Sequence, residues 1–127
     1  MSSIPLVAVV EDDLTSRTAL ERVLRAGGYD VASYESAEEF LASPPVPPAI
    51  GLLRDLHLGG VSGLDLQRRL VEDGWMIPVI VITASDSIRT EDEARRLGCV
   101  GFLRKPCEGG TILALLGSLP GRSSSSG

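Results

Sequence analysis

The chain has 127 residues, of which 43% are hydrophobic and 23% charged, with a net charge of −5 and a pI near 4.8. This composition is typical of one soluble globular domain, and the acidic balance argues against nucleic acid or an anionic membrane as a partner of this segment. No Cys/His pattern has the spacing of a zinc or redox motif, and no apolar run reaches the roughly 20 residues of a membrane span. Because the N-terminus lacks a basic leader and a cleavage-like site, we expect a cytoplasmic protein.

Short apolar runs alternate with amphipathic stretches along the chain. Three of the runs are nearly continuous Val, Ile and Leu, as is typical of parallel strands covered on both faces. The pattern predicts an α/β fold with a five-stranded, doubly wound parallel sheet. We expect strands at 6–10, 31–34, 50–55, 79–83 and 100–103, and helices at 14–28, 36–43, 63–74, 87–98 and 110–119.

Local signals mark the ends of the first two expected helices. The first helix should end at the Gly-Gly pair 27–28, and the second should begin with a capping box formed by Ser36 and Glu39. The apolar residues at helical spacing in the first helix are Leu14, Leu20, Val23 and Leu24.

Two segments have the composition of a connection or a tail. The run "SPPVPP" at 43–48 cannot be a helix or a central strand, so we expect a stiff surface connection there. The tail "PGRSSSSG" at 120–127 is a flexible Ser-rich end or the start of a linker to a further domain. One domain over residues 1–119 is therefore expected.

Polar residues follow the predicted strands at the points where each strand ends. They are Glu11, Asp12 and Asp13 after the first strand, Asp55 after the third, Thr83 after the fourth and Lys105 shortly after the fifth. Ligands of open α/β sheets bind beyond the carboxyl ends of the strands. We expect these side chains to converge on one rim of the sheet.

Carboxylates that lie close together repel one another unless a cation joins them. Hard oxygen ligands with few protein contacts suit Mg²⁺, which keeps some of its waters. A carboxylate beside Mg²⁺, with a lysine and a hydroxyl opposite, meets the requirements for transfer of a phosphoryl group onto an aspartate. The arrangement predicts that Asp55 is phosphorylated.

Four motifs in order support a family resemblance over residues 4 to 119: "VVEDD", "RDLHLGGVSGLDL", "VIVITA" and "FLRKP". Together they resemble the receiver domain of two-component response regulators, the CheY-like superfamily, and especially the FixJ/NarL-type regulators. The resemblance implies a flavodoxin-like (βα)5 fold with strand order 2-1-3-4-5. It also implies a phosphorelay protein that accepts its phosphoryl group from a sensor histidine kinase and is not itself an enzyme.

The resemblance assigns the acceptor and the metal ligands. Asp55 is implied to be the phosphoacceptor and, together with Asp12, to ligate Mg²⁺ directly. Glu11 is implied to act through water, and the backbone carbonyl of His57 to complete the protein ligands.

The resemblance also assigns a switch. Lys105 is implied to pair with the phosphoryl oxygens across a cis bond to Pro106, and Thr83 to donate a hydrogen bond to them. Small Ala84 leaves room for the phosphoryl group, and Phe102 is implied to be the aromatic residue that turns inward on phosphorylation.

The end of the chain bears on partners. The helix at 110–119 is apolar around more of its surface than one buried stripe needs, at Ile112, Leu113, Leu115, Leu116 and Leu119. This helix is either fully packed against the domain, or it joins a homodimer through the last two helices on phosphorylation. A DNA-binding output domain outside this segment, and hence transcription regulation, fits the FixJ/NarL-type resemblance.

Three residues depart from the family pattern. Glu11 replaces an aspartate, Gly59 stands where proline is common, and Arg54 precedes Asp55 where a small or apolar residue is expected. On strand alternation Arg54 points to the face opposite Asp55, so its charge must find a carboxylate or reach solvent.

Other interpretations remain at this stage. Asp12 or Asp13 could simply cap the helix that follows. The departures are also compatible with a phosphate-independent interaction domain, a pseudo-receiver. A phosphohydrolase with an aspartyl intermediate would want a second acid two residues after its nucleophile, where this chain has His57.

Overall fold

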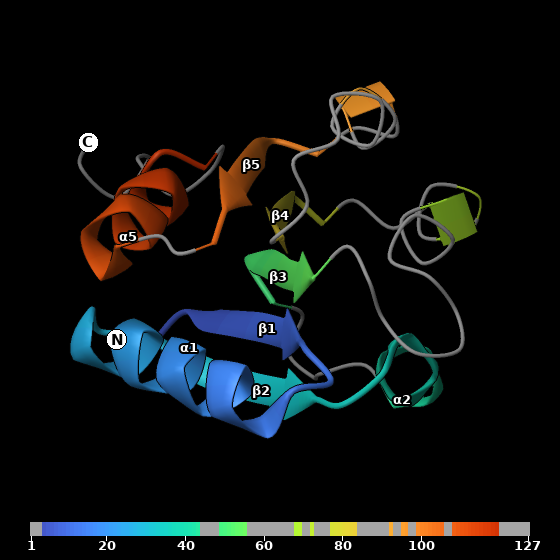
Figure 1. Cartoon of the computed structure of the whole chain (residues 1–127), viewed down its shortest axis with the longest axis horizontal. Helices are drawn as coiled ribbons and strands as arrows, with labels where there is room; N and C mark the ends of the chain where they lie inside the picture. Colours follow the sequence, from blue (N-terminus) through green and yellow to red (C-terminus); the bar gives the residue numbers. More distant parts are fainter. Residues whose placement is uncertain are drawn as a thin grey trace.

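The structure, a computed structural model, describes residues 4–43, 49–55, 77–83, 99–105 and 108–119, and single residues at 68, 69, 72, 92, 95 and 96. Five parallel strands form one sheet in the order β2-β1-β3-β4-β5 (Figure 1). The strands are β1 (Leu6–Val10), β2 (Asp30–Tyr34), β3 (Gly51–Asp55), β4 (Val79–Thr83) and β5 (Gly101–Arg104). The helices are α1 (Leu14–Ala26), α2 (Ala37–Ala42) and α5 (Gly109–Gly117). The predicted fold and strand order are confirmed.

Some predictions fall on other parts of the chain. The expected helices at 63–74 and 87–98 lie mostly outside the described residues. Those that are described within them, Arg68, Arg69, Glu72, Asp92, Arg95 and Arg96, are helical. The Pro-rich run at 44–48 and the tail at 120–127 also lie outside, so the domain boundary at 119 stays a prediction. Within the described ranges, no helix is long and apolar enough to cross a membrane.

Each face of the sheet buries its own apolar cluster, because side chains alternate along a strand. One face, the α1/α5 face, packs Leu24 of α1 and Leu116 of α5 against the strand residues Val7, Val9, Leu53, Ile80 and Ile82. The other face, the α2 face, packs Phe40 of α2 against Ala8, Val10, Leu52, Val79 and Val81. The strands are thus buried on both sides, as their continuous apolar runs predict.

The first helix ends in a Schellman motif. The N–H of Gly28 donates to the carbonyl of Arg25 at 3.1 Å, and the N–H of Tyr29 donates to that of Leu24 at 3.0 Å. Gly28 has a φ of 93°, which a residue with a Cβ adopts only at a cost. Leu24 and Tyr29 are both buried in the α1/α5 cluster, so the motif also directs the chain into β2.

One apolar residue of α1 lies elsewhere than its spacing suggested. Leu14, the first residue of the helix, is 66% exposed, whereas Leu24 is fully buried. At 100° per residue Leu20 and Val23 lie to one side of Leu24 around the helix axis, and Leu14 lies about 80° from Leu24 on the opposite side, outside the inward stripe. Leu20 and Val23 are partly buried.

The second helix begins with the predicted cap. The hydroxyl of Ser36 accepts a hydrogen bond from the N–H of Glu39 at 3.1 Å. The side chain of Glu39 reaches back to the N–H of Glu35, at 3.2 Å, one residue before the cap. Both partners of the capping box therefore satisfy backbone donors at the start of α2.

The apolar residues of α5 face the domain. Ile112, Leu116 and Leu119 are buried. Leu113 and Leu115 fill the space beside two glycines, since a Cβ at Gly27 would meet Leu113 and one at Gly101 would meet Leu115. The breadth of the apolar surface thus reflects packing against both α1 and β5. The exposed residues of the helix are small or polar: Gly110, Thr111, Ala114 and Gly117.

Two glycine substitutions separate backbone conformation from space. A Cβ at Gly28 or at Gly110 would meet nothing within 4 Å, but only Gly28 has a positive φ. We expect Gly28→Ala to lower the free energy of unfolding by about 1–2 kcal/mol. Gly110→Ala, in α5, should raise it by about 0.5–1 kcal/mol. Urea unfolding measures both, and equal effects of the two substitutions would contradict this account of the α1 terminus.

Candidate functional site

The strand register brings the predicted polar residues together at the carboxyl ends of the strands, which form one edge of the sheet. Val10, which precedes Glu11, pairs with Arg54, which precedes Asp55. Asp55 pairs in turn with Ile82, next to Thr83. The N–H of Lys105 donates to the carbonyl of Thr83 at 2.8 Å, so Lys105 leaves β5 at the same edge.

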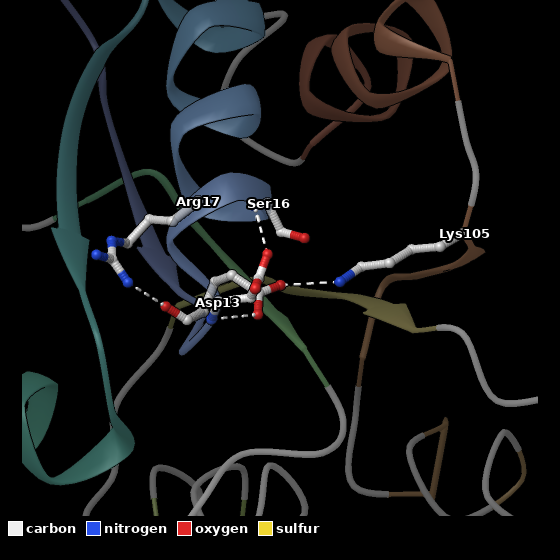
Figure 2. Close-up of polar contacts among 5 residues, drawn as sticks. Asp13, Ser16, Arg17 and Lys105 are labelled. Carbon is white, nitrogen blue, oxygen red and sulfur yellow. Dashed lines mark hydrogen bonds and ion pairs between the residues drawn. The ribbon is translucent and has the colours of Figure 1, made fainter.

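Glu11 makes several polar contacts at this edge, and only 2% of it is exposed. Its Oε1 accepts from Nζ of Lys105 at 2.9 Å, and its Oε2 accepts from the N–H of Asp13 at 3.1 Å. Its carbonyl accepts from Nη1 of Arg17 at 2.8 Å (Figure 2). The Lys105 side chain is 28% exposed and that of Glu11 only 3%, so the ion pair is buried mainly on the carboxylate side.

Asp13 caps α1. Its Oδ2 accepts from the N–H of Ser16 at 2.8 Å (Figure 2). This hydrogen bond, and then the hydroxyl of Ser16 and the charges of Lys105 and Arg17, lower the pKa of the Asp13 carboxyl below 3.8. Because the folded state lowers this pKa, the stabilisation is complete above pH 3.8 and is lost as the pH falls through the lower value. The capping interpretation therefore holds for Asp13, and the neighbouring Asp12 is an exposed carboxylate.

The two predicted switch residues lie on the α2 face. Thr83 is fully buried at the end of β4. Phe102 pairs with Val81 in the neighbouring strand and packs, partly buried, against the α2 cluster. Thr83 is two residues beyond Val81, so both switch positions share this face.

Several predicted roles concern residues outside the described part of the chain. They are the roles of the Asp55 side chain, His57, Ala84 and Pro106. For Asp55 the structure gives the backbone position at the end of β3. These roles stay predictions, as does the effect of Gly59.

The donor set suits Mg²⁺. Asp12 and Asp55 carry hard carboxylate oxygens at the ends of the adjacent strands β1 and β3, and Glu11 adds a third carboxylate. Among the side chains that the structure describes, no three His, Cys, Asp or Glu residues form a complete metal site. The side chain of Asp55 is not among those described.

The sequence did not reveal two contacts of the site. The pairing of Lys105 with Glu11 joins residues 94 positions apart. The sequence feature that could have indicated it is the glutamate at position 11, which is longer than the aspartate usual in the family. Arg17, one helical turn after the cap, was also missed.

Arg54 is buried close to this edge, with 1% of its surface exposed. The alternative that its charge reaches solvent along its own stem is therefore wrong. Its cross-strand neighbours Val10 and Val81 are also fully buried, so the side chain lies within the sheet's covered face and does not reach water.

A double-mutant cycle tests the ion pair. Lys105→Met leaves the Glu11 carboxylate buried without its cation, and Glu11→Gln removes the charge while keeping the shape. We expect Lys105→Met to cost about 2 kcal/mol of folding free energy, and the cycle with Glu11→Gln to show a coupling of about 1–2 kcal/mol. Urea unfolding of the four proteins measures this. Additive effects would show that the pair contributes nothing beyond its separate side chains.

Comparison with known proteins places the chain in a family. Nodulation protein W of Bradyrhizobium diazoefficiens is 39% identical over 101 residues, which cover 80% of this chain and 44% of that protein. The transcriptional regulatory protein FixJ of Rhizobium meliloti is 36% identical over 107 residues, covering 84% of this chain and 52% of FixJ. The chain thus spans about half the length of these curated relatives.

Solved structures and a family model agree. The crystal structure of FixJ-N is similar with a TM-score of 0.82 at 34% identity, covering 91% of this chain and 92% of that one. A CheY-like receiver domain from Methanospirillum hungatei has the same fold, with a TM-score of 0.87 at 20% identity over 98% of this chain and all of that one. The family model of the response regulator receiver domain matches residues 7–116. The chain belongs to the response regulator receiver domain family of two-component systems.

Proposed function

We propose that this receiver accepts a phosphoryl group from a histidine kinase on Asp55, in a reaction that needs Mg²⁺. The observation that carries the proposal is the buried pair of Glu11 and Lys105. This pair holds an ammonium at the carboxyl ends of the strands, where Asp12 follows β1 and Asp55 ends β3. A cation fixed beside carboxylates, with the buried Thr83 at the next strand end, provides charge neutralisation and positioning.

The reaction exchanges one bond to phosphorus for another. A carboxylate oxygen of Asp55 attacks the phosphorus, the P–N bond to the kinase histidine breaks, and an acyl phosphate forms. The imidazole nitrogen keeps the electron pair of the broken bond. In this proposal the chain is the acceptor of the group and not an enzyme that turns over a substrate.

Four residues would hold Mg²⁺ in this proposal. Asp12 and Asp55 would hold Mg²⁺, with Glu11 acting through water and the His57 carbonyl completing the ligands. The metal would neutralise charge on the phosphoryl oxygens. Its fit rests on the oxygen donors at the ends of β1 and β3.

The resting ion pair gives the switch its starting point. Lys105 is bound to Glu11, so an arriving phosphoryl group must compete with a carboxylate for the same ammonium. The group brings nearly two negative charges and three acceptor oxygens, which favour the transfer of Lys105 and draw in the hydroxyl of Thr83. Phe102, on the same face as Thr83, would then turn inward, with Ala84 leaving room for the phosphoryl group.

The change of surface would control an output. Nodulation protein W and FixJ are each about twice as long as this chain, and FixJ is a transcriptional regulatory protein. We propose that the segment regulates a DNA-binding output domain. A homodimer through the last two helices remains part of the proposal, but α5 would offer Thr111 and Ala114 to a partner, because its leucines pack inward.

Phosphorylation is tested by the intact mass of the protein after incubation with acetyl phosphate and Mg²⁺. We expect one added phosphoryl group on the wild type, none on Asp55→Asn and none with a chelator. Asp30→Asn, at the exposed start of β2, is the matched control and should be phosphorylated as the wild type is.

The opposite result is equally clear. A wild-type protein that is folded by circular dichroism and gains no mass from acetyl phosphate or from a phosphorylated kinase domain would contradict the proposal. It would favour the phosphate-independent interaction domain.

A further inference from the structure

Arg54 is the largest side chain that the described part of the chain buries completely. A guanidinium stays charged at every accessible pH, so its burial places a permanent positive charge inside the domain. Burying a charge generally costs folding free energy, and an apolar side chain of similar length is often as stable or more so. Stability alone therefore gives no reason for an arginine at this position.

The charge lies in the middle of a row that crosses the whole sheet. Cross-strand pairing aligns one residue from each strand, and the row runs in spatial order through Tyr34, Val10, Arg54, Val81 and Phe102. The row belongs to the α2 face, where the Tyr34 ring meets Phe40 edge to face with 5.3 Å between the centroids. Its far end is Phe102, the predicted switch aromatic residue.

The row also adjoins the predicted phosphorylation site. Asp55 follows Arg54 directly in β3, and Thr83 lies two residues beyond Val81, the direct neighbour of Arg54 in β4. The Cα atoms of consecutive residues are about 3.8 Å apart, so the guanidinium of Arg54 and the carboxylate of Asp55 extend from neighbouring points of one strand. Because Arg54 is excluded from water, salt and solvent screen this charge weakly.

From this placement we infer that Arg54 is a positioning residue that sets the electrostatic balance of the phosphorylation site from behind the sheet. Its charge opposes the binding of Mg²⁺ to the empty site and favours the added negative charge of the phosphoryl group. The charge thus weakens the binding of Mg²⁺ and strengthens the binding of the phosphoryl group. Mg²⁺ is therefore held more tightly once the anion has arrived. The inference rests on the proposed function, because it concerns the same site.

The variants separate charge from packing. Arg54→Met removes the charge and keeps an unbranched side chain, and Arg54→Lys keeps the charge. Leu52→Met is the matched control, because Leu52 is fully buried on the same strand and face. Calorimetric titration measures the affinity for Mg²⁺ alone, and then for beryllofluoride, an anionic mimic of the phosphoryl group, at saturating Mg²⁺.

We expect Arg54→Met to bind Mg²⁺ about tenfold more tightly and beryllofluoride about tenfold more weakly than the wild type. Arg54→Lys and Leu52→Met should stay within about twofold for both ligands. General loosening of the domain would weaken both ligands together, so the opposite signs identify the charge.

Equal affinities of Arg54→Met and the wild type, or changes of the same sign for both ligands, would overturn the inference while leaving phosphorylation of Asp55 intact. If Arg54→Met does not fold, Arg54→Gln is measured instead. Failure of both to fold, with Arg54→Lys folded, would assign the charge to the fold and also overturn the inference. A folded wild type that neither binds beryllofluoride nor gains mass from acetyl phosphate would instead remove the proposed function.

Discussion

A nearly buried carboxylate needs a cation, and at the edge of this sheet Glu11 obtains one from a residue 94 positions away. The pair of Glu11 and Lys105 joins the end of the first strand to the end of the last. The same glutamate anchors the start of α1 through Asp13 and Arg17. The geometry of the site therefore depends on one ion pair that the chain can form only when β1 and β5 are both in place.

The two faces of the sheet carry different kinds of side chain. The α1/α5 face is packed with aliphatic side chains, and even the glycines at 27 and 101 are contacted there by leucines of α5. The α2 face carries the residues that would move or carry charge: Arg54, Thr83 and Phe102. In the proposed switch, a change of charge at the strand ends would therefore act on the α2 face, opposite the aliphatic packing of the α1/α5 face.

Local signals predicted much of the fold. Continuous Val and Ile runs identified the strands, and the Ser36 cap and the glycine pair at 27–28 marked helix ends, because these preferences act between near neighbours. The strand-end rule also predicted that the side chains of Glu11, Thr83 and Lys105 would lie at the carboxyl ends of the strands, on one rim of the sheet. Long-range features were harder to predict. Neither the partner of Lys105 nor the complete burial of Arg54 follows from spacing, since both depend on which strands become neighbours.

In the proposed switch, Lys105 leaves Glu11 when the site receives its anion. The most direct measurement is a crystal structure of the domain with Mg²⁺ and beryllofluoride. We expect Nζ of Lys105 then to lie within hydrogen-bond distance of a fluoride of the beryllofluoride bound at Asp55 and no longer to contact Oε1 of Glu11. A structure with beryllofluoride bound at Asp55 and the 2.9 Å contact between Lys105 and Glu11 retained would contradict it.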